Sequence, residues 1–473
     1  MVERALQSLE RAAMQNMEDY EAQQISNTLY AMAKAKYTPS EPLLVEALER
    51  QAVAVAGRGD FNAQNVAITM WAYATMGREP GKELVKALEE RAEELAGSFQ
   101  AQNMSNTLWA YATMGRVPGE GLMRALERRM GEPGGISEHE QDVTNTLWAY
   151  ATMGREPGEG LMRALEGRAE ALAGSFNAQD VANTMWAYAT IGREPGEGLM
   201  RALEMRTEEV AASFNAQNVA NTLWSACVFA TLFASKIASR WAQLLAQLLV
   251  SRAACYSEVN LCQLHQVFLS CSLEEKLHVE AFNDMHSDMQ ALRDACRSAF
   301  EGTRVTPSAT QQQVSKTLRS MGLRVEDEFR CPKSGYSFDM LVHHIAPAMG
   351  GEGTSTSRDG TWVVEFDGPS HFLACSEGGG REGGRARTGA TCLKQRHLQL
   401  LGYSFFSVPH WEWDACEGFN TLQATRERQQ YLGRMIAMMK PQLRDATNLI
   451  KPAQTRQVST VSTAFDGVGF APA

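Results

Sequence analysis

Apolar side chains recur at helical spacing through the first half of the chain. Met104, Leu108 and Tyr111 fall on one face of a predicted helix. Gly115 suits the C-terminal end of that helix, and Pro118 suits the first turn of a second helix. Each such stretch therefore predicts two helices joined by a short turn.

This pattern repeats with a nearly constant period, which is clearest at one aromatic position. Successive tryptophans there are 38, 39, 38 and 38 residues apart. They are Trp71, Trp109, Trp148, Trp186 and Trp224, and Tyr30 takes the same place one copy earlier. Six copies are evident, and we predict that a degenerate seventh begins at Tyr256. Because one helix pair cannot bury its own apolar face, we expect about six to seven stacked pairs forming an α-solenoid.

Asparagine, glycine and proline residues indicate where the helices of each copy begin and end. The expected N-caps of the first helices are Asn62, Asn177 and Asn215, whose side chains accept bonds from free backbone N–H groups. The expected helix ends are Gly77, Gly115, Gly154 and Gly192, and prolines expected in the first turn of the second helices are Pro80, Pro118, Pro157 and Pro195. Residues 1–19 resemble a second helix without its partner, so we expect a partial repeat or a cap helix there.

The pattern changes after about residue 300 and predicts a small α/β domain. Predicted helices cover 311–321 and 393–401, and predicted strands cover 324–329, 336–342, 361–367 and 403–408. The predicted organisation is a partial repeat at 1–19, helical repeats at 20–254, a degenerate repeat and linker at 255–305, the α/β domain at 306–440 and a flexible tail at 441–473.

Composition and charge narrow the functional classes. The formal net charge of the 473-residue chain is −10, which argues against general electrostatic binding to nucleic acid. Residues 1–300 carry roughly 26 basic and 38 acidic side chains, so the acidity lies in the repeats. The nine cysteines form no CxxC pair, and no apolar run reaches 18 residues. We therefore expect free thiols in a reducing compartment and no membrane span. If the chain binds RNA, we expect it to use a local surface rather than its overall charge.

Two polar positions vary between otherwise similar first helices. The first position holds Gln24, Asn65, Asn103, Asp142, Asp180 and Asn218, and the second holds Ser26, Ala67, Ser105, Thr144, Ala182 and Ala220. Helical-repeat RNA readers use two or three such side chains for each base. One hypothesis is that the polar members of both positions contact RNA bases. The alternative is that they are solvent-exposed and vary freely.

Three further recurring positions also leave two interpretations open. The asparagines Asn27, Asn106, Asn145, Asn183 and Asn221 either contact RNA or form a structural ladder between copies, which we prefer. The tryptophans either stack on bases or belong to the core, and we prefer the core. The arginines Arg78, Arg116, Arg155 and Arg193 either complement the helix dipole or meet phosphates.

Short motifs in the C-terminal part resemble a RAP domain. They are Glu365–Phe372, Leu393–Leu398, Gly402-Tyr403 and Val408–Trp413. The upstream repeats resemble those of octotricopeptide and Fas-activated-kinase-like RAP proteins of organelles. This resemblance implies RNA metabolism in a chloroplast or mitochondrion: transcript stabilisation, processing, splicing, translation or ribosomal RNA maturation. The implied partners are single-stranded RNA and other RNA-processing proteins, although no transit peptide is visible.

The RAP fold resembles a restriction-endonuclease-like core, which suggests a nuclease alternative. Asp339 and Glu365 match the two acids of that core, while Asp367 stands where a lysine is expected. Carboxylates on adjacent strands could bind Mg²⁺ and activate water, with Lys394 assisting and His371 or His410 moving a proton.

We prefer a non-catalytic interpretation without a cofactor, in which Asp367-Gly368-Pro369 builds a turn and Arg396 or Lys394 holds Glu365. Lys394, Arg396 and His371 then remain candidates for RNA contact. A third hypothesis, which the acidic repeats favour, is a protein-interaction scaffold.

Overall fold

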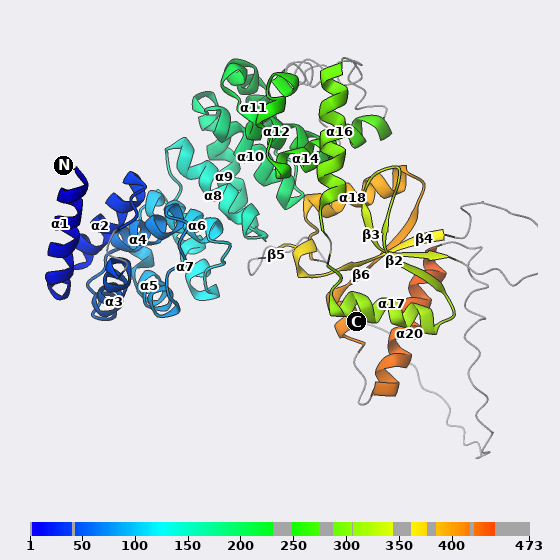
Figure 1. The fold of residues 1–473 in the computed structure, drawn as a ribbon, viewed down its shortest axis with the longest axis horizontal. Coiled ribbons are helices and arrows are strands. Elements are labelled where there is room, and N and C mark those ends of the chain that lie inside the picture. Colours follow the sequence, from blue (N-terminus) through cyan, green and yellow to red (C-terminus); the bar gives the residue numbers. More distant parts are fainter. Residues whose placement is uncertain are drawn as a thin grey trace, which may run out of the picture. The chain divides into compact units, whose positions relative to one another are not determined.

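The computed structural model describes most of the chain as two compact units (Figure 1). The described residues are 2–39, 43–229, 248–274, 287–304, 306–343, 361–375, 385–416 and 421–439. The first unit comprises Met1–Thr306, Glu328–Phe338 and Asp367–Tyr403, and the second comprises Pro307–Asp327, Asp339–Phe366 and Ser404–Ala473. The predicted tail at 441–473 lies outside the described residues.

Stacked helix pairs make up most of the first unit, as the period predicts. The first helices are α2 (Ala22–Ala35), α4 (Ala63–Thr75), α6 (Ala101–Thr113), α8 (Glu140–Thr152), α10 (Ala178–Ile191), α12 (Ala216–Val228) and α14 (Glu258–Leu273). The second helices are α3 (Leu44–Gly57), α5 (Lys82–Leu95), α7 (Glu120–Met130), α9 (Glu159–Leu172) and α11 (Glu197–Val210), with α16 (Ser287–Gly302) following α14. Each first helix packs on the next one in chain order, and α14 packs on α12 as a seventh copy would. The solenoid is thereby confirmed.

The first described helix, α1 (Val2–Gln15), has the character of a second helix. It packs on α3, and a short 3₁₀ turn follows it. Such turns also follow α5, α9 and α11, and another precedes α14. They are Met17–Asp19, Ala96–Ser98, Ala173–Ser175, Ala211–Ser213 and Ala253–Cys255.

The predicted helix ends are largely confirmed. The Asn177 side chain caps α10 by accepting from the backbone N–H of Asp180 at 3.1 Å. Gly192 has φ +65°, the left-handed conformation that ends a helix with least strain when the residue is glycine. The expectation for the prolines is wrong by a few residues: α5 begins at Lys82 after the N-cap Gly81, so Pro80 precedes the helix. Pro80 is buried there, so packing of its ring against the repeats holds the turn in place.

Neighbouring copies share one recurring polar contact. A tyrosine of the first helix donates its phenol hydrogen to a glutamate on the second helix of the preceding copy. The pairs are Tyr73–Glu49 at 3.1 Å, Tyr111–Glu89 at 2.8 Å, Tyr150–Glu127 at 3.0 Å and Tyr188–Glu166 at 3.0 Å. The phenol rings are almost fully buried, so each contact satisfies a polar group inside the stack.

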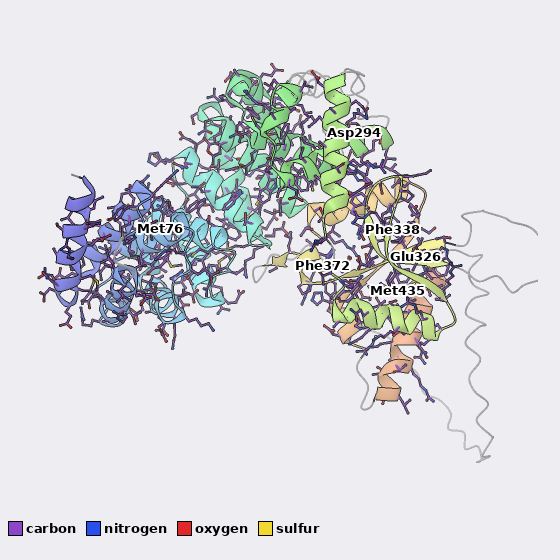
Figure 2. The ribbon with its side chains drawn as sticks, in the orientation of Figure 1. Met76, Asp294, Glu326, Phe338, Phe372 and Met435 are labelled. Atoms are coloured by element: carbon purple, nitrogen blue, oxygen red, sulfur yellow. The ribbon has the colours of Figure 1, made fainter. Side chains whose placement is uncertain are left out.

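The second unit holds most of a four-stranded sheet with its own core. Its elements are α17 (Ala309–Ser320), β2 (Arg324–Arg330), β3 (Ser337–His343), β4 (Thr361–Asp367), β6 (Ser404–Pro409), α19 (His410–Asp414) and α20 (Thr421–Met439). The strand order is β2-β3-β4-β6, and β3 pairs antiparallel with β4, where Met340 faces Val364. Trp362, Val364 and Trp413 join this core, and Met435 packs against it (Figure 2). The predicted small α/β fold is confirmed.

A segment of the predicted C-terminal domain groups with the repeats instead. It contains a 3₁₀ turn (Pro369–His371), β5 (Ala374–Cys375) and α18 (Gly389–Leu400). Strand β5 pairs in parallel with β1 (Arg155–Glu156), and α18 packs on α10, α12 and α14. Leu393 belongs to the core of the repeats, so apolar burial explains why this segment lies there. Within the described residues, no helix is long and apolar enough to cross a membrane.

Candidate nucleic-acid interface

A groove of about 660 Å³ crosses five first helices, from α2 to α10. In α4 it is lined by Gln64, Ile68, Trp71 and Thr75, which are spaced by four, three and four residues and so share one helix face. Its lining residues are Asn27, Tyr30, Lys34, Gln64, Ile68, Trp71, Thr75, Gln102, Asn103, Asn106, Trp109, Gln141, Asp142, Asn145 and Gln179. Each copy thus contributes a stripe of side chains from the same helix face to the groove.

Aromatic rings run along this stripe. The ring centroids of Tyr30 and Trp71 are 5.4 Å apart, and those of Trp71 and Trp109 are 6.4 Å apart with planes inclined by 28°. Further along, Trp148 and Trp186 are separated by 6.5 Å. These tryptophans pack against the core, as preferred from the sequence, but they are only half-buried. The rings therefore also present aromatic surface on which a base could stack.

Amide side chains lie beside the rings. Gln64 and Gln102 are exposed, and Asn106 and Asn145 are half-buried. Among the described residues, none of these four amides forms a hydrogen bond with another protein group. Within the described part of the chain, the recurring asparagine joins the next copy only at the α12–α14 junction, where Gln263 donates to Asn221 Oδ1 at 3.1 Å. Among the described residues, the preferred structural ladder does not include Asn106 or Asn145, so their amides can be reached by a ligand.

The groove carries little charge. Lys34 is the single cation among its described lining residues, and its Nζ lies 5.2 Å from the centroid of the Trp71 ring. Asp142 is the single anion in the same described lining, and its carboxylate accepts a hydrogen bond from Ser137 Oγ at 2.7 Å. Although the repeats are acidic, the groove is therefore close to neutral and does not repel a polynucleotide strand.

The first variable position has a local structural role in most copies. It is the third residue of the helix, and its side-chain oxygen accepts a hydrogen bond from the N-cap backbone N–H. These capping contacts involve Gln24 at 3.0 Å, Asn65 at 3.3 Å, Asn103 at 3.2 Å, Asp180 at 3.0 Å and Asn218 at 3.2 Å. Amides and carboxylates both supply an oxygen, so the capping role tolerates this variation. Asn103 and Asp142 also line the groove.

The second variable position is buried between neighbouring first helices. Ser105 and Thr144 are each 1% exposed. Thr144 Oγ1 donates to Asp180 of the next copy at 3.1 Å, and Asn65 donates to Ser26 of the preceding copy at 3.1 Å. Base reading at both variable positions stays a prediction, with a competing structural role for these side chains.

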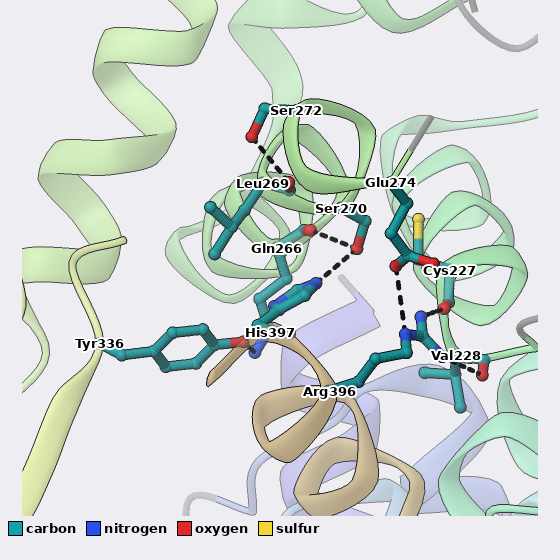
Figure 3. A network of polar contacts seen from close by, with 10 residues as sticks. All are labelled: Cys227, Val228, Gln266, Leu269, Ser270, Ser272, Glu274, Tyr336, Arg396 and His397. Carbon is teal, nitrogen blue, oxygen red and sulfur yellow. Dashed lines mark hydrogen bonds and ion pairs between the residues drawn. The ribbon is translucent and has the colours of Figure 1, made fainter. Parts of the chain in front are cut away.

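Arg396, predicted to contact phosphate, is engaged within the first unit (Figure 3). Its guanidinium donates to Glu274 at 3.1 Å, to the carbonyl of Val228 at 3.2 Å and to the carbonyl of Cys227. Those carbonyls end α12, so Arg396 satisfies acceptors left free at a helix C-terminus. The interpretation that Arg396 holds Glu365 is wrong, because its carboxylate partner is Glu274.

The neighbouring His397 lies in a closed polar network, also shown in Figure 3. Its Nε2 is 2.7 Å from Ser270 Oγ, and its Nδ1 is 3.0 Å from the phenol oxygen of Tyr336. Burial lowers the pKa of His397 to about 3, helped by the positive charge of Arg396, so the ring is neutral at ordinary pH.

The other contacts in this network settle which ring nitrogen of His397 carries the hydrogen. Gln266 donates to the Tyr336 oxygen at 3.1 Å, and Ser270 donates to the Gln266 carbonyl at 2.9 Å. The Tyr336 hydrogen therefore goes to Nδ1 of His397, and Nε2–H donates to Ser270. Every polar group of the ring is thereby satisfied.

His371 lies beside a buried carboxylate in the first unit. Its Nδ1 is 3.5 Å from Asp367, whose second oxygen is 3.5 Å from Nε of Arg387. The Arg387 guanidinium also lies 5.6 Å from the ring centroid of Phe372, which Figure 2 labels. The turn predicted at Asp367-Gly368-Pro369 leads into the 3₁₀ helix at Pro369–His371. Asp367 thus lies within ion-pair distance of both His371 and Arg387.

The nuclease residues are distributed over both units. Asp339 and Glu365 belong to the second unit, where Asp339 Oδ2 accepts from the backbone N–H of Phe366 at 2.8 Å. Asp367 and Lys394 belong to the first unit. In the part of the chain that the structure describes, no group of three or more His, Cys, Asp or Glu side chains is placed to hold a metal ion. Catalysis with Mg²⁺ remains a prediction.

Two features were missed in the sequence. The groove glutamines recur seven residues before each aromatic residue of the stripe, a spacing that could have revealed a shared helix face. The partners of His397 come from α14 and from Tyr336, far away in the chain, and no local pattern predicts them.

Comparisons with known families agree with this architecture. A model described as RNA-editing substrate-binding complex 6 protein matches residues 2–232, and the RAP domain model matches residues 364–427. A search of curated proteins found no match. The two family matches support an RNA-related function. The chain is a helical-repeat protein with a RAP domain.

Proposed function

We propose that the chain binds single-stranded RNA along the groove of α2–α10, without cleaving it. The observation that carries the proposal is the repeated stripe of half-exposed aromatic rings and unengaged amides. Stacking and edge-on hydrogen bonding need bases that are free of a duplex, and sequence-specific RNA recognition targets unpaired bases for this reason.

The matched families support the biological setting of this proposal. One is named for a complex that binds RNA-editing substrates, and the other is the RAP domain. We infer that the chain acts in a mitochondrion or chloroplast, in transcript stabilisation, processing, splicing, translation or ribosomal RNA maturation. Other RNA-processing proteins would then be its partners, and the RAP domain would add affinity or recruit them.

Replacing one groove tryptophan tests the proposal. In Trp109→Leu the apolar packing is largely kept but the stacking surface is lost. We expect the dissociation constant for unstructured RNA, measured by fluorescence anisotropy, to rise. The rise should correspond to a loss of about 1–3 kcal/mol of binding free energy. The matched control is Trp411→Leu, a half-buried tryptophan of α19 in the second unit. An affinity of Trp109→Leu equal to that of the unaltered chain would show that RNA does not bind in the groove, whatever the effect of Trp411→Leu.

A further inference from the structure

The groove presents the same chemistry in successive copies. In α6 its stripe consists of Gln102, Asn106 and Trp109, and in α8 Gln141 and Asn145 take the corresponding places. Two copies depart from this set: Tyr30 replaces the tryptophan in α2, and Ile68 replaces the asparagine in α4. Copies with the same side chains in the same geometry favour the same base.

The ring spacing is nearly the same at two junctions between copies. Ring centroids of neighbouring tryptophans are 6.4 Å apart at the α4–α6 junction and 6.5 Å apart at the α8–α10 junction. At these two junctions, a strand that places one base on each copy meets similar ring contacts, as in helical-repeat proteins that read one base per repeat. A repeated base satisfies such a surface better than a mixed sequence.

The side chains also select among the bases. The amide groups of Gln102 and Asn106 each offer one donor side and one acceptor side, and no described protein group occupies them. Asparagine and glutamine pair with adenine through its N6 donor and N7 acceptor, whereas guanine offers two acceptors on the same edge. Every base has a face that can stack on tryptophan, so the ring contributes affinity for any base. The amides contribute the selectivity among bases.

We propose that the groove recognises a single-stranded tract that repeats adenine, one base for each copy. This inference rests on the proposed function, because it names the RNA that the same groove prefers. Five first helices line the groove, so the recognised tract is five nucleotides long.

The test compares labelled RNAs that differ only in arrangement. One strand carries five contiguous adenines within fixed unstructured flanks, and the second carries the same nucleotides with the adenines dispersed. Further strands carry five uridines, cytidines or guanines in place of the adenines. Using the full chain and fluorescence anisotropy, we expect the adenine tract to bind at least about tenfold more tightly than the dispersed strand.

Amide variants connect this preference to the groove. The double variant Gln102→Leu with Asn106→Leu alters one of the five copies, so it should retain RNA binding but reduce the difference between the strands. The matched control is Gln217→Leu, since Gln217 holds the equivalent exposed place in α12 without lining the groove. Both changed side chains of the double variant lack protein hydrogen-bond partners among the described residues, so the fold should persist, which circular dichroism would verify.

The possible failures can be told apart. Equal binding of all strands, or preference for a tract of another base, would overturn the adenine proposal while leaving RNA binding in place. An unchanged preference in the double variant would also overturn it. Absence of binding to every strand would overturn the proposed function itself.

Discussion

The buried ring of His397 links its own protonation state to the stability of the first unit. Its pKa is lowered to about 3 by burial and by Arg396, from an ordinary value near 6.5. The native state therefore holds a neutral ring, while the unfolded chain takes up a proton below about pH 6.5. The free energy of unfolding is therefore not reduced by this ring above that pH. Below it, the free energy of unfolding falls progressively as the pH falls toward 3.

We predict a corresponding pH dependence of unfolding. Between about pH 6.5 and 3, His397 should lower the free energy of unfolding by at most about 1.4 kcal/mol per pH unit. Urea unfolding of the chain and of His397→Gln at several pH values would measure the difference in slope. His139→Gln is the control, because His139 is an exposed histidine on the repeats. Equal slopes for the chain and His397→Gln would contradict the assignment.

At the scale of elements, the docking of α18 on the repeats depends on the absence of a side chain. A Cβ added at Gly389 would overlap the carbonyl oxygen of Ala189 in α10 and press on Val228 of α12. Helix α18 can approach α10 and α12 this closely because Gly389 has no side chain to fill the space. The neighbouring contacts of Arg396 then bind α18 to the end of α12.

We predict that Gly389→Ala lowers the free energy of unfolding by about 1–3 kcal/mol, because the clash involves backbone rather than a flexible side chain. Gly167→Ala is the matched control: it lies inside α9 with no atom near its added Cβ, so it should stabilise by about 0.5–1 kcal/mol. Thermal unfolding and amide hydrogen exchange across α18 would record both effects. The same change in both variants would show that α18 is not held by this approach.

Elements also show what sequence can and cannot predict. The period fixed by Trp71 and its successors predicted the stacked pairs, and β4 (Thr361–Asp367) has the predicted bounds. The grouping of Asp367–Tyr403 with the repeats was missed because contacts such as Arg396–Glu274 join residues distant in the chain. Variation at Asp180 suggested base reading, since a sequence does not reveal that a capping position accepts either an amide or a carboxylate.

At the scale of the whole molecule, a net charge of −10 and a nearly neutral groove predict RNA binding that salt affects little. With Lys34 as the single groove cation among the described lining residues, about one phosphate would be neutralised. The logarithm of the binding constant should then fall with the logarithm of salt concentration with a slope near −0.7. Affinities measured at several KCl concentrations would give this slope. A slope steeper than about −3 would indicate phosphate contacts on another surface.

The recurring tyrosine–glutamate contact allows further copies of the repeat to be added to the array. Because successive copies are joined by this same contact, a duplicated copy would find a ready-made neighbour on either side. Each duplication would also carry its own ring and amides into the groove. The length of RNA that the proposed interface would bind could then change in evolution with the number of copies, without a change in any individual side chain.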